Sequence, residues 1–196
     1  AGAGDSGIFA TRVSPAAAIL DGAGVALCTA ADLQTRPAVA WGHTNWLAAW
    51  QDFRNTADFN IYGGRVTPAG MALDGQGFAI CSAANDQASV SLSWNQTNWF
   101  AAWYDERHTG LGSAVYGGRV DAGGAALDAD GVSLAGPGGG NLIPSVHFGA
   151  GGRALVAWSQ LMAAPFQAER VRAVFWQESY VFTDLGILGT NGSLLA

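Results

Sequence analysis

The sequence predicts an all-β chain built from repeated units of four short strands. Two stretches of fourteen residues, Trp41 to Arg54 (WGHTNWLAAWQDFR) and Trp94 to Arg107 (WNQTNWFAAWYDER), agree at nine positions. The apolar runs of each unit are about five residues long, and clusters of turn-forming residues separate them. Glycine interrupts the chain too often for the longer apolar periodicity of a helix.

The strands of one unit follow in a fixed order, which is clearest in the second copy. Four strands are expected, at 38–41, at 46–51, at 61–67, and at one or both of 71–73 and 78–81. Residues 43–45 and 67–70 are rich in turn formers, and residues 52–60 form a longer polar connection. The apolar run WLAAW has no polar face, as expected for a strand that is covered on both sides.

The remaining copies are recognised by a second motif. The segment Ile61–Val66 (IYGGRV) returns as Val115–Val120 and, earlier, as Ile8–Val13. The last copy is degenerate, and its Arg170 and Val171 match the Arg-Val of the motif. We expect a single domain over residues 1–196, with units at about 1–36 (a half unit), 37–89, 90–143 and 144–196 (degenerate).

The order Pro-x-x-x-Trp, turn, apolar strand, Asp-x-Arg, polar loop, Ile-Tyr resembles the blade of TolB-type propellers. It resembles still more closely the LVVW-x-D-x-R tandem repeats of secreted proteins from myxobacteria and related bacteria. The resemblance covers about residues 8–171, and the residues that carry it are Pro37, Trp41, Trp50, Asp52, Arg54, Ile61 and Tyr62, with Trp94, Trp103, Asp105, Arg107, Val115 and Tyr116. It implies a β-propeller-type array of four-stranded antiparallel blades and says little about activity, because propellers host many unrelated functions.

The number of units raises a question of closure. The repeat supplies about three and a half blades, whereas the smallest closed propellers use four. The chain could be a piece of a longer protein, could be completed by a second chain, or could form an open array with unpaired strand edges. We favour the first explanation and expect, as the next best, a protein partner that completes the propeller.

Composition narrows the class of partner. Apolar residues make up 49% of the chain and charged residues 12%, and the net charge is −6 with a pI near 4.7. An acidic protein is a poor ligand for nucleic acid, and no apolar run is long enough to insert into a membrane. We expect an extracellular, cell-surface or periplasmic location in a bacterium. Residues 1–5 lack the features of a signal peptide, which fits either a cytoplasmic protein or a mature chain.

No cofactor or metal is expected. Cys28 and Cys81 occupy matching points of different units, so they are expected to be buried thiols rather than a disulfide or a metal site. The three histidines occupy unrelated positions of the repeat. The segment 128–131 (DADG) resembles the start of a calcium loop but lacks the acidic ligand at the twelfth position, so an ordinary turn is expected.

Two sets of residues are candidates for a site. The recurring Asp52, Arg54, Asp105 and Arg107 could bind a cation or a sugar hydroxyl. The structural interpretation is favoured, in which each Asp and Arg fix a loop by charge-assisted hydrogen bonds, because a blade-defining residue should recur and a catalytic one need not.

The second set lies at the first turn of each unit. Asn45 and Trp46, with Asn98 and Trp99, could form a platform on which a sugar ring stacks while the amide donates hydrogen bonds. The alternative is that both tryptophans fill the space between blades.

The leading hypothesis is an extracellular, non-enzymatic binding or assembly module that recognises a protein or a glycan. No catalytic residue can be assigned, since the chain has neither a G-x-S-x-G elbow nor an HExxH helix. One alternative is a secreted polysaccharide-acting hydrolase, whose acids should break the repeat; the unmatched acids are Glu106, Glu169, Glu178 and Asp184. Another is an accessory subunit of a larger complex.

Overall fold

The computed structural model describes residues 6–138, 140–162, 168–178, 180–188 and 194–195. Over these residues the chain is all-β, and its strands form antiparallel sheets that follow one another along the sequence. The predicted fold class is therefore confirmed. The helical structure in the described part is a short 3-10 turn at Ala150–Gly152, and no helix there is long and apolar enough to cross a membrane.

The strands group into a half-blade and three further blades. The half-blade holds β1 (Ile8–Ala10) and β2 (Val25–Cys28). The second blade holds β3 (Gln34–Gly42), β4 (Asn45–Asp52), β5 (Asn60–Val66) and β6 (Phe78–Cys81). The third holds β7 (Gln87–Trp94), β8 (Asn98–Asp105), β9 (Ala114–Asp121) and β10 (Val132–Ala135). The fourth holds β11 (Gly140–Phe148), β12 (Ala154–Leu161), β13 (Glu169–Gln177), β14 (Tyr180–Leu188) and β15 (Leu194–Leu195).

The structure resolves the choice between two positions for the outer strand. Residues 78–81 form β6, whereas residues 71–73 contribute an isolated bridge between Val66 and Ala72. The same bridge recurs in the half-blade and in the third blade. A tight turn before it, with Gly70 at a φ of 84°, brings the chain back onto the end of β5 and prevents a longer ladder.

Strand pairing repeats from blade to blade in the same register. Trp50 on β4 lies opposite Tyr62 on β5, and Trp103 on β8 lies opposite Tyr116 on β9. The apolar run of β4 is buried from Leu47 to Trp50, as predicted for a strand that is covered on both faces.

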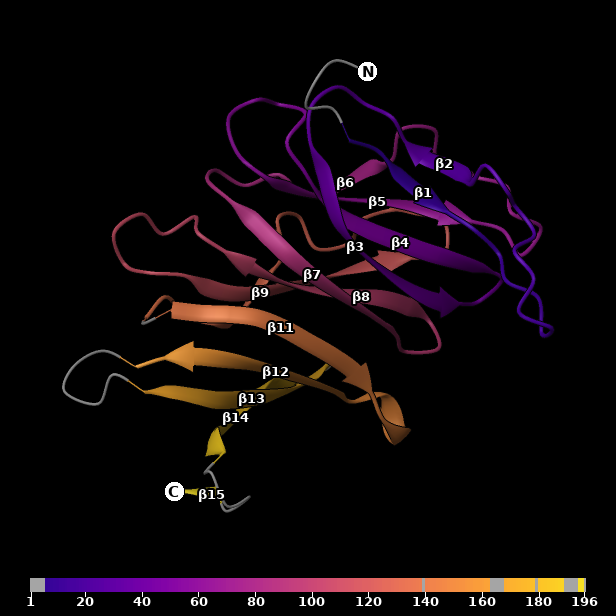
Figure 1. The fold of residues 1–196 in the computed structure, drawn as a ribbon. Helices are drawn as coiled ribbons and strands as arrows, with labels where there is room; N and C mark the ends of the chain where they lie inside the picture. The colour runs from indigo at the N-terminus through magenta and orange to yellow at the C-terminus, as the bar shows by residue number, and fades with distance from the viewer. Residues whose placement is uncertain (1–5, 139, 163–167, 179, 189–193, 196) are drawn as a thin grey trace.

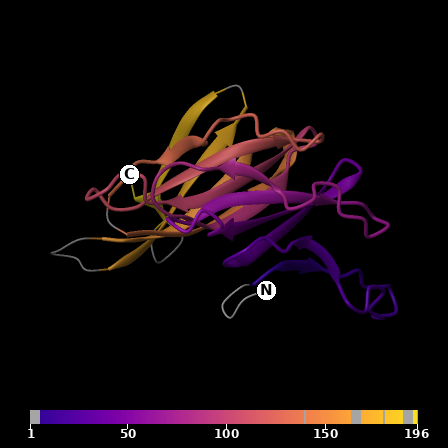
Figure 2. The same ribbon diagram turned by 90° about the horizontal axis from the view of Figure 1, so that it is seen from above.

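The blades lie in chain order across the molecule, with the half-blade at one end and the fourth blade at the other (Figure 1 and, from above, Figure 2). The largest apolar core lies between the second and third blades and includes Leu47 from β4 and Trp99 from β8. The first strands of the blades, β3, β7 and β11, contact one another in succession. Val146 and Phe148 on β11 donate their amides to the hydroxyls of Ser91 and Ser93 on β7, each at 3.1 Å.

Candidate functional site

The second blade holds a buried carboxylate whose partners occupy most of its hydrogen-bonding capacity. Asp52 has no exposed surface and accepts a hydrogen bond from Trp50 Nε1 at 2.8 Å. Arg54 donates to the same carboxylate through Nε at 2.8 Å and Nη2 at 2.6 Å. The guanidinium also lies 4.0 Å from the ring centre of Tyr62 and 3.2 Å from Cys28 Sγ on the half-blade. The cluster therefore joins two neighbouring blades.

The third blade repeats this arrangement. Asp105, also without exposed surface, accepts from Trp103 Nε1 at 2.9 Å and from Arg107 at 2.8 and 2.7 Å. Arg107 lies 3.8 Å from the ring centre of Tyr116, and its Nη2 lies 3.4 Å from Cys81 Sγ of the preceding blade. A carboxylate enclosed in this way cannot meet a sugar or a solvated cation, so the contacts support the structural interpretation.

A second family of ion pairs lies toward the outer strands, and the sequence reasoning missed it. Arg65 donates to Asp74 at 2.6 Å within the second blade and, through Nη1, to the carbonyl of Ala122 in the third at 3.1 Å. Equivalent pairs join Arg12 to Asp21 and Arg119 to Asp128. Both partners were visible as recurring residues, and the constant nine-residue spacing was the signal that could have paired them.

These ion pairs shift the titration of their acids. Hydrogen bonds from the Arg12 side chain and backbone lower the pKa of Asp21 to about 2. Burial opposes ionisation of Asp128, yet the hydrogen bonds from Arg119 outweigh it and the pKa of that carboxyl is lowered. Both carboxylates are therefore charged at neutral pH and act as fixed anchors.

The two cysteines are buried free thiols, as the sequence predicts. Burial raises the pKa of Cys81 to about 12, and it raises the pKa of Cys28 as well. A thiol that stays protonated at neutral pH is a poor nucleophile, so neither cysteine suits covalent catalysis.

The two turns predicted as a sugar-binding platform differ in exposure. Trp46 is 41% exposed and Asn45 is half-buried beside it, whereas Trp99 has no exposed surface and Asn98 is buried. Trp99 packs in the apolar core between the second and third blades and donates its Nε1 to the carbonyl of Ala40 at 3.2 Å. The third-blade turn therefore offers no ring face to a sugar, and only the second-blade turn keeps an accessible indole.

Of the remaining polar candidates, Glu169 on β13 is exposed, and several others are held by neighbouring groups. Glu178 accepts from Arg119 Nη1 at 2.7 Å and Glu106 accepts from the hydroxyl of Tyr104, while the side chain of Asp184 lies outside the described residues. In the DADG segment, Asp130 accepts from the amide of Ser82 at 3.0 Å. Among the described residues, no group of three or more His, Cys, Asp or Glu could hold a metal ion.

A different group of residues lies where the first strand of each blade is bulged. The ladder skips between Thr35 and Ala38 in β3, and β7 and β11 skip at the equivalent points. At these skips Arg36, Ser89 and Ile143 have positive φ values of 52°, 55° and 30°. Arg36 is exposed and donates Nη1 to Ser89 Oγ at 3.1 Å, from one first strand to the next.

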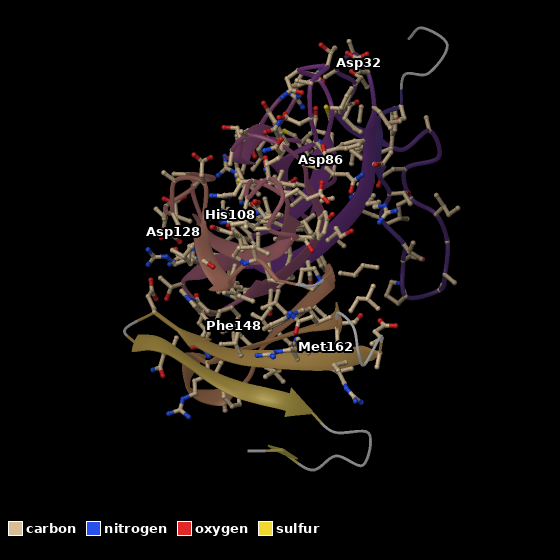
Figure 3. The ribbon with its side chains drawn as sticks, turned by 90° about the vertical axis from the view of Figure 1, so that its left-hand side faces the viewer. Asp32, Asp86, His108, Asp128, Phe148 and Met162 are labelled. Carbon is tan, nitrogen blue, oxygen red and sulfur yellow. The ribbon has the colours of Figure 1, made fainter. Side chains whose placement is uncertain are left out.

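Arg36 and Ser89 lie near the starts of β3 and β7, close to the loops that lead into these strands. Asp32 and Asp86, which precede those strands, lie in succession along the array in Figure 3. Asp86 accepts from the amide of Phe59 at 2.8 Å, and Asp58 accepts from the amide of Asn85 at 3.0 Å, so the loops of successive blades are joined here. The sequence reasoning did not single out Arg36, because it sought acids and aromatic residues rather than bulges.

Successive antiparallel blades of four or five strands that pack through their first strands define a β-propeller-type architecture. No family model matches this chain, and no curated protein matches it in sequence. Similarity to solved structures is extensive, however, and these structures are propeller-type glycosidases.

The chain resembles the Hadza microbial sialidase Hz136 with a TM-score of 0.61 and 12% identity, over 83% of this chain and 38% of that one. It resembles the endo-arabinase from Bacteroides thetaiotaomicron VPI-5482 with a TM-score of 0.52 and 12% identity, over 79% of this chain and 61% of that one. It resembles a Trypanosoma rangeli sialidase with a TM-score of 0.54 and 7% identity, over 90% of this chain and 33% of that one. The chain thus spans between about a third and three fifths of these proteins, and the similarity establishes the fold.

Proposed function

We propose that the chain is part of a carbohydrate-directed β-propeller of the glycoside hydrolase type, and that its saccharide approaches the end at which β3 and β7 begin. The observation that carries the proposal is the bulge at Arg36, Ser89 and Ile143. The fold similarity to a sialidase and an endo-arabinase agrees with it.

The bulges combine a repeated backbone with unlike side chains. A positive φ in a non-glycine residue costs free energy and is often kept at binding sites. Residues that define a blade recur, as Asp52 and Asp105 do, whereas Arg36 has Ser89 and Ile143 as its counterparts. A backbone conformation that is repeated from blade to blade but carries different side chains suits recognition of an asymmetric ligand.

The chemistry at this position suits a polar saccharide. The guanidinium of Arg36 is exposed and presents a planar set of N–H donors, one of which is occupied by Ser89. Such a group binds a carboxylate with two parallel hydrogen bonds and binds vicinal hydroxyls more weakly. We therefore propose an acidic saccharide as the preferred ligand.

Turnover would need an acid near the bound sugar, and the two aspartates that precede β3 and β7 are the residues to test. Asp86 accepts from the amide of Phe59 through Oδ1 at 2.8 Å, which fixes its carboxylate beside the start of β7. Binding without turnover is the second candidate function, because two of the four acids that break the repeat, Glu106 and Glu178, are held by neighbouring side chains.

The test compares Arg36→Asn with Arg153→Asn in binding and hydrolysis assays on matched acidic and neutral oligosaccharides. Asparagine tolerates the positive φ at position 36, so the first variant removes the charge without new strain. Arg153 is also exposed and donates to Gln177, so the second variant is a matched loss of one surface arginine.

The proposal predicts that Arg36→Asn weakens binding of the acidic saccharide about tenfold or more, as expected for loss of a charged hydrogen-bonding partner. Arg153→Asn should leave it unchanged. Equal binding by all three proteins, or binding of neutral sugars alone, would overturn the proposed site. Binding without turnover by the unmodified chain would favour the non-enzymatic module.

Two finer assignments belong to the same proposal. The first is kinship with TolB-type or LVVW-x-D-x-R repeats, which rests on the blade residues from Pro37 to Tyr62. The second is a location outside the cytoplasm, where polysaccharides are found. Fractionation of the source cells followed by immunodetection tests the location.

A further inference from the structure

A large apolar cavity lies between the half-blade and the second blade. Its volume is about 730 Å³, and β1, β3 and β4 border it. Phe9, Val39 and Trp46 line it and are 55%, 63% and 41% exposed. Apolar side chains left this open are normally covered by another surface. The repeat indicates which surface is missing.

The half-blade reproduces the outer part of a complete blade. Ile8 lies opposite Cys28 in β1 and β2, as Ile61 lies opposite Cys81 in β5 and β6, and both ladders skip at the next residue. The ion pair of Arg12 with Asp21 likewise repeats that of Arg65 with Asp74. Strand β1 is therefore the counterpart of β5.

In the second blade the inner edge of β5 is paired with β4 over seven positions, from Asp52↔Asn60 to Trp46↔Val66. In the part of the chain that the structure describes, β1 pairs with β2 alone, in a two-stranded sheet. The edge of β1 that faces the cavity thus has backbone groups free to pair with a strand.

The apolar core shows the same deficit. The core around the half-blade includes Ile8, Cys28 and Trp50, and the core between the second and third blades has Ile61, Cys81 and Trp103 at the equivalent points. The complete core contains in addition side chains from the first two strands of the earlier blade, which are Ala38, Ala40, Leu47 and Ala49. The half-blade core has no counterpart of these side chains among the described residues.

Trp46 shows what the missing surface should offer. Its counterpart Trp99 is fully buried and donates Nε1 to the carbonyl of Ala40 on the first strand of the preceding blade. Trp46 has the same position in its own blade and borders the cavity instead. The indole N–H and the apolar ring face of Trp46 could therefore contact a further strand. That strand would lie where β3 lies relative to Trp99.

We infer that this cavity is a docking site for a two-stranded β-hairpin with the chemistry of the inner hairpin of the repeat. Its second strand pairs antiparallel with β1, and its first strand presents a carbonyl to Trp46. The first strand must end in glycine, because a Cβ at Gly42, the last residue of β3, would lie 2.6 Å from Trp99 Nε1 in the equivalent interface.

The test adds the hairpin to the chain. Residues 34–58, the inner hairpin of the second blade and its connection, are placed as a second copy directly ahead of Ser6, where the repeat would put them. Hydrogen exchange is measured over residues 8–13, together with acrylamide quenching of Trp46 by comparison with Trp46→Phe. The matched control carries Gly42→Val in the added copy only.

The inference predicts exchange at least about tenfold slower over residues 8–13 in the extended chain, because β1 gains a ladder. It also predicts that Trp46 becomes shielded and that the Gly42→Val control shows neither effect. Unchanged exchange and quenching in a folded extended chain would overturn it. So would a dimer of the original chain, seen by light scattering, in which Trp46 is already shielded, since a second copy would then cover the cavity.

Discussion

Arg54 Nη2 lies 3.2 Å from Cys28 Sγ on the preceding blade while it donates to the buried carboxylate of Asp52. Arg107 stands in the same relationship to Cys81, at 3.4 Å. One arginine thus pairs with the last residue of a strand and contacts the preceding blade. The same arrangement in both complete copies explains why the Asp-x-Arg sequence recurs, and it makes the packing of the blades depend on these buried charges.

Asp105→Asn should destabilise the chain by about 3 kcal/mol, since breaking a buried ion pair leaves Arg107 without its counter-charge. The amide also cannot accept from Trp103 and Arg107 together as the carboxylate does. Urea unfolding at pH 7 measures the loss. Glu169→Gln, at an exposed acid on β13, is the control and should change little. A loss for Asp105→Asn as small as that of the control would contradict the structural role.

Gly131→Ala and Gly110→Ala separate strain from steric conflict. Both glycines have a left-handed backbone, with φ values of 78° and 79°. A Cβ at Gly131 would lie 2.5 Å from the ring of the fully buried Trp103, whereas a Cβ at Gly110 meets nothing within 4 Å. Gly110→Ala should cost about 1 kcal/mol, the penalty of the left-handed conformation. Gly131→Ala should cost about 1–3 kcal/mol more through overpacking. Equal losses of unfolding free energy in the two variants, measured by thermal or urea unfolding, would show that the Trp103 ring moves aside without cost.

Trp99→Ala should destabilise the chain by about 3–5 kcal/mol, as removal of a fully buried aromatic side chain does. Trp46→Ala should cost clearly less, because the side chain is 41% exposed and lacks the bond that Trp99 makes to Ala40. Urea unfolding of the two variants provides the comparison, with each serving as the control for the other. Similar losses would mean that Trp46 is covered in solution.

Stability should fall in acid as Asp21 is protonated. Its pKa is lowered to about 2 by Arg12, from an unfolded value of about 3.9. Because the folded pKa is the lower one, the contribution is complete above about pH 4 and is lost as the pH falls toward 2. Melting temperatures measured between pH 2 and pH 5 should fall less steeply for Asp21→Asn than for the unmodified chain. Parallel pH profiles would show that this pair contributes nothing to acid sensitivity.

The sequence predicts the fold well because the repeat is both close and regular. The spacing of WLAAW, the turns and IYGGRV fixes four strands per unit, and the structure pairs them in equivalent registers. The outer strand was ambiguous, since 71–73 and 78–81 are both short and apolar; the turn at Gly70 decides between them. The ion pair of Arg65 with Asp74 was missed, although the nine-residue spacing that recurs in three units was a signal for it.

The candidate site could be predicted only in part. Trp46 and Trp99 occupy the same position in nearly identical sequences, so no local pattern could distinguish them. Their burial depends on whether a preceding blade supplies a first strand, which is a long-range property. The bulge at Arg36 was also out of reach, because a positive φ at a non-glycine residue is imposed by packing between strands rather than by its own side chain.

The sequence by itself determined the all-β fold and the four-stranded unit of the second and third blades, because these follow from local periodicity and from recurrence. The tertiary structure alone decided which tryptophan is buried, which arginine is presented at the strand bulges and where an apolar cavity remains open. The physical reason is that the burial of a side chain depends on a second surface that packs against it. A residue is covered only when another blade lies against it, and that blade is distant in the sequence.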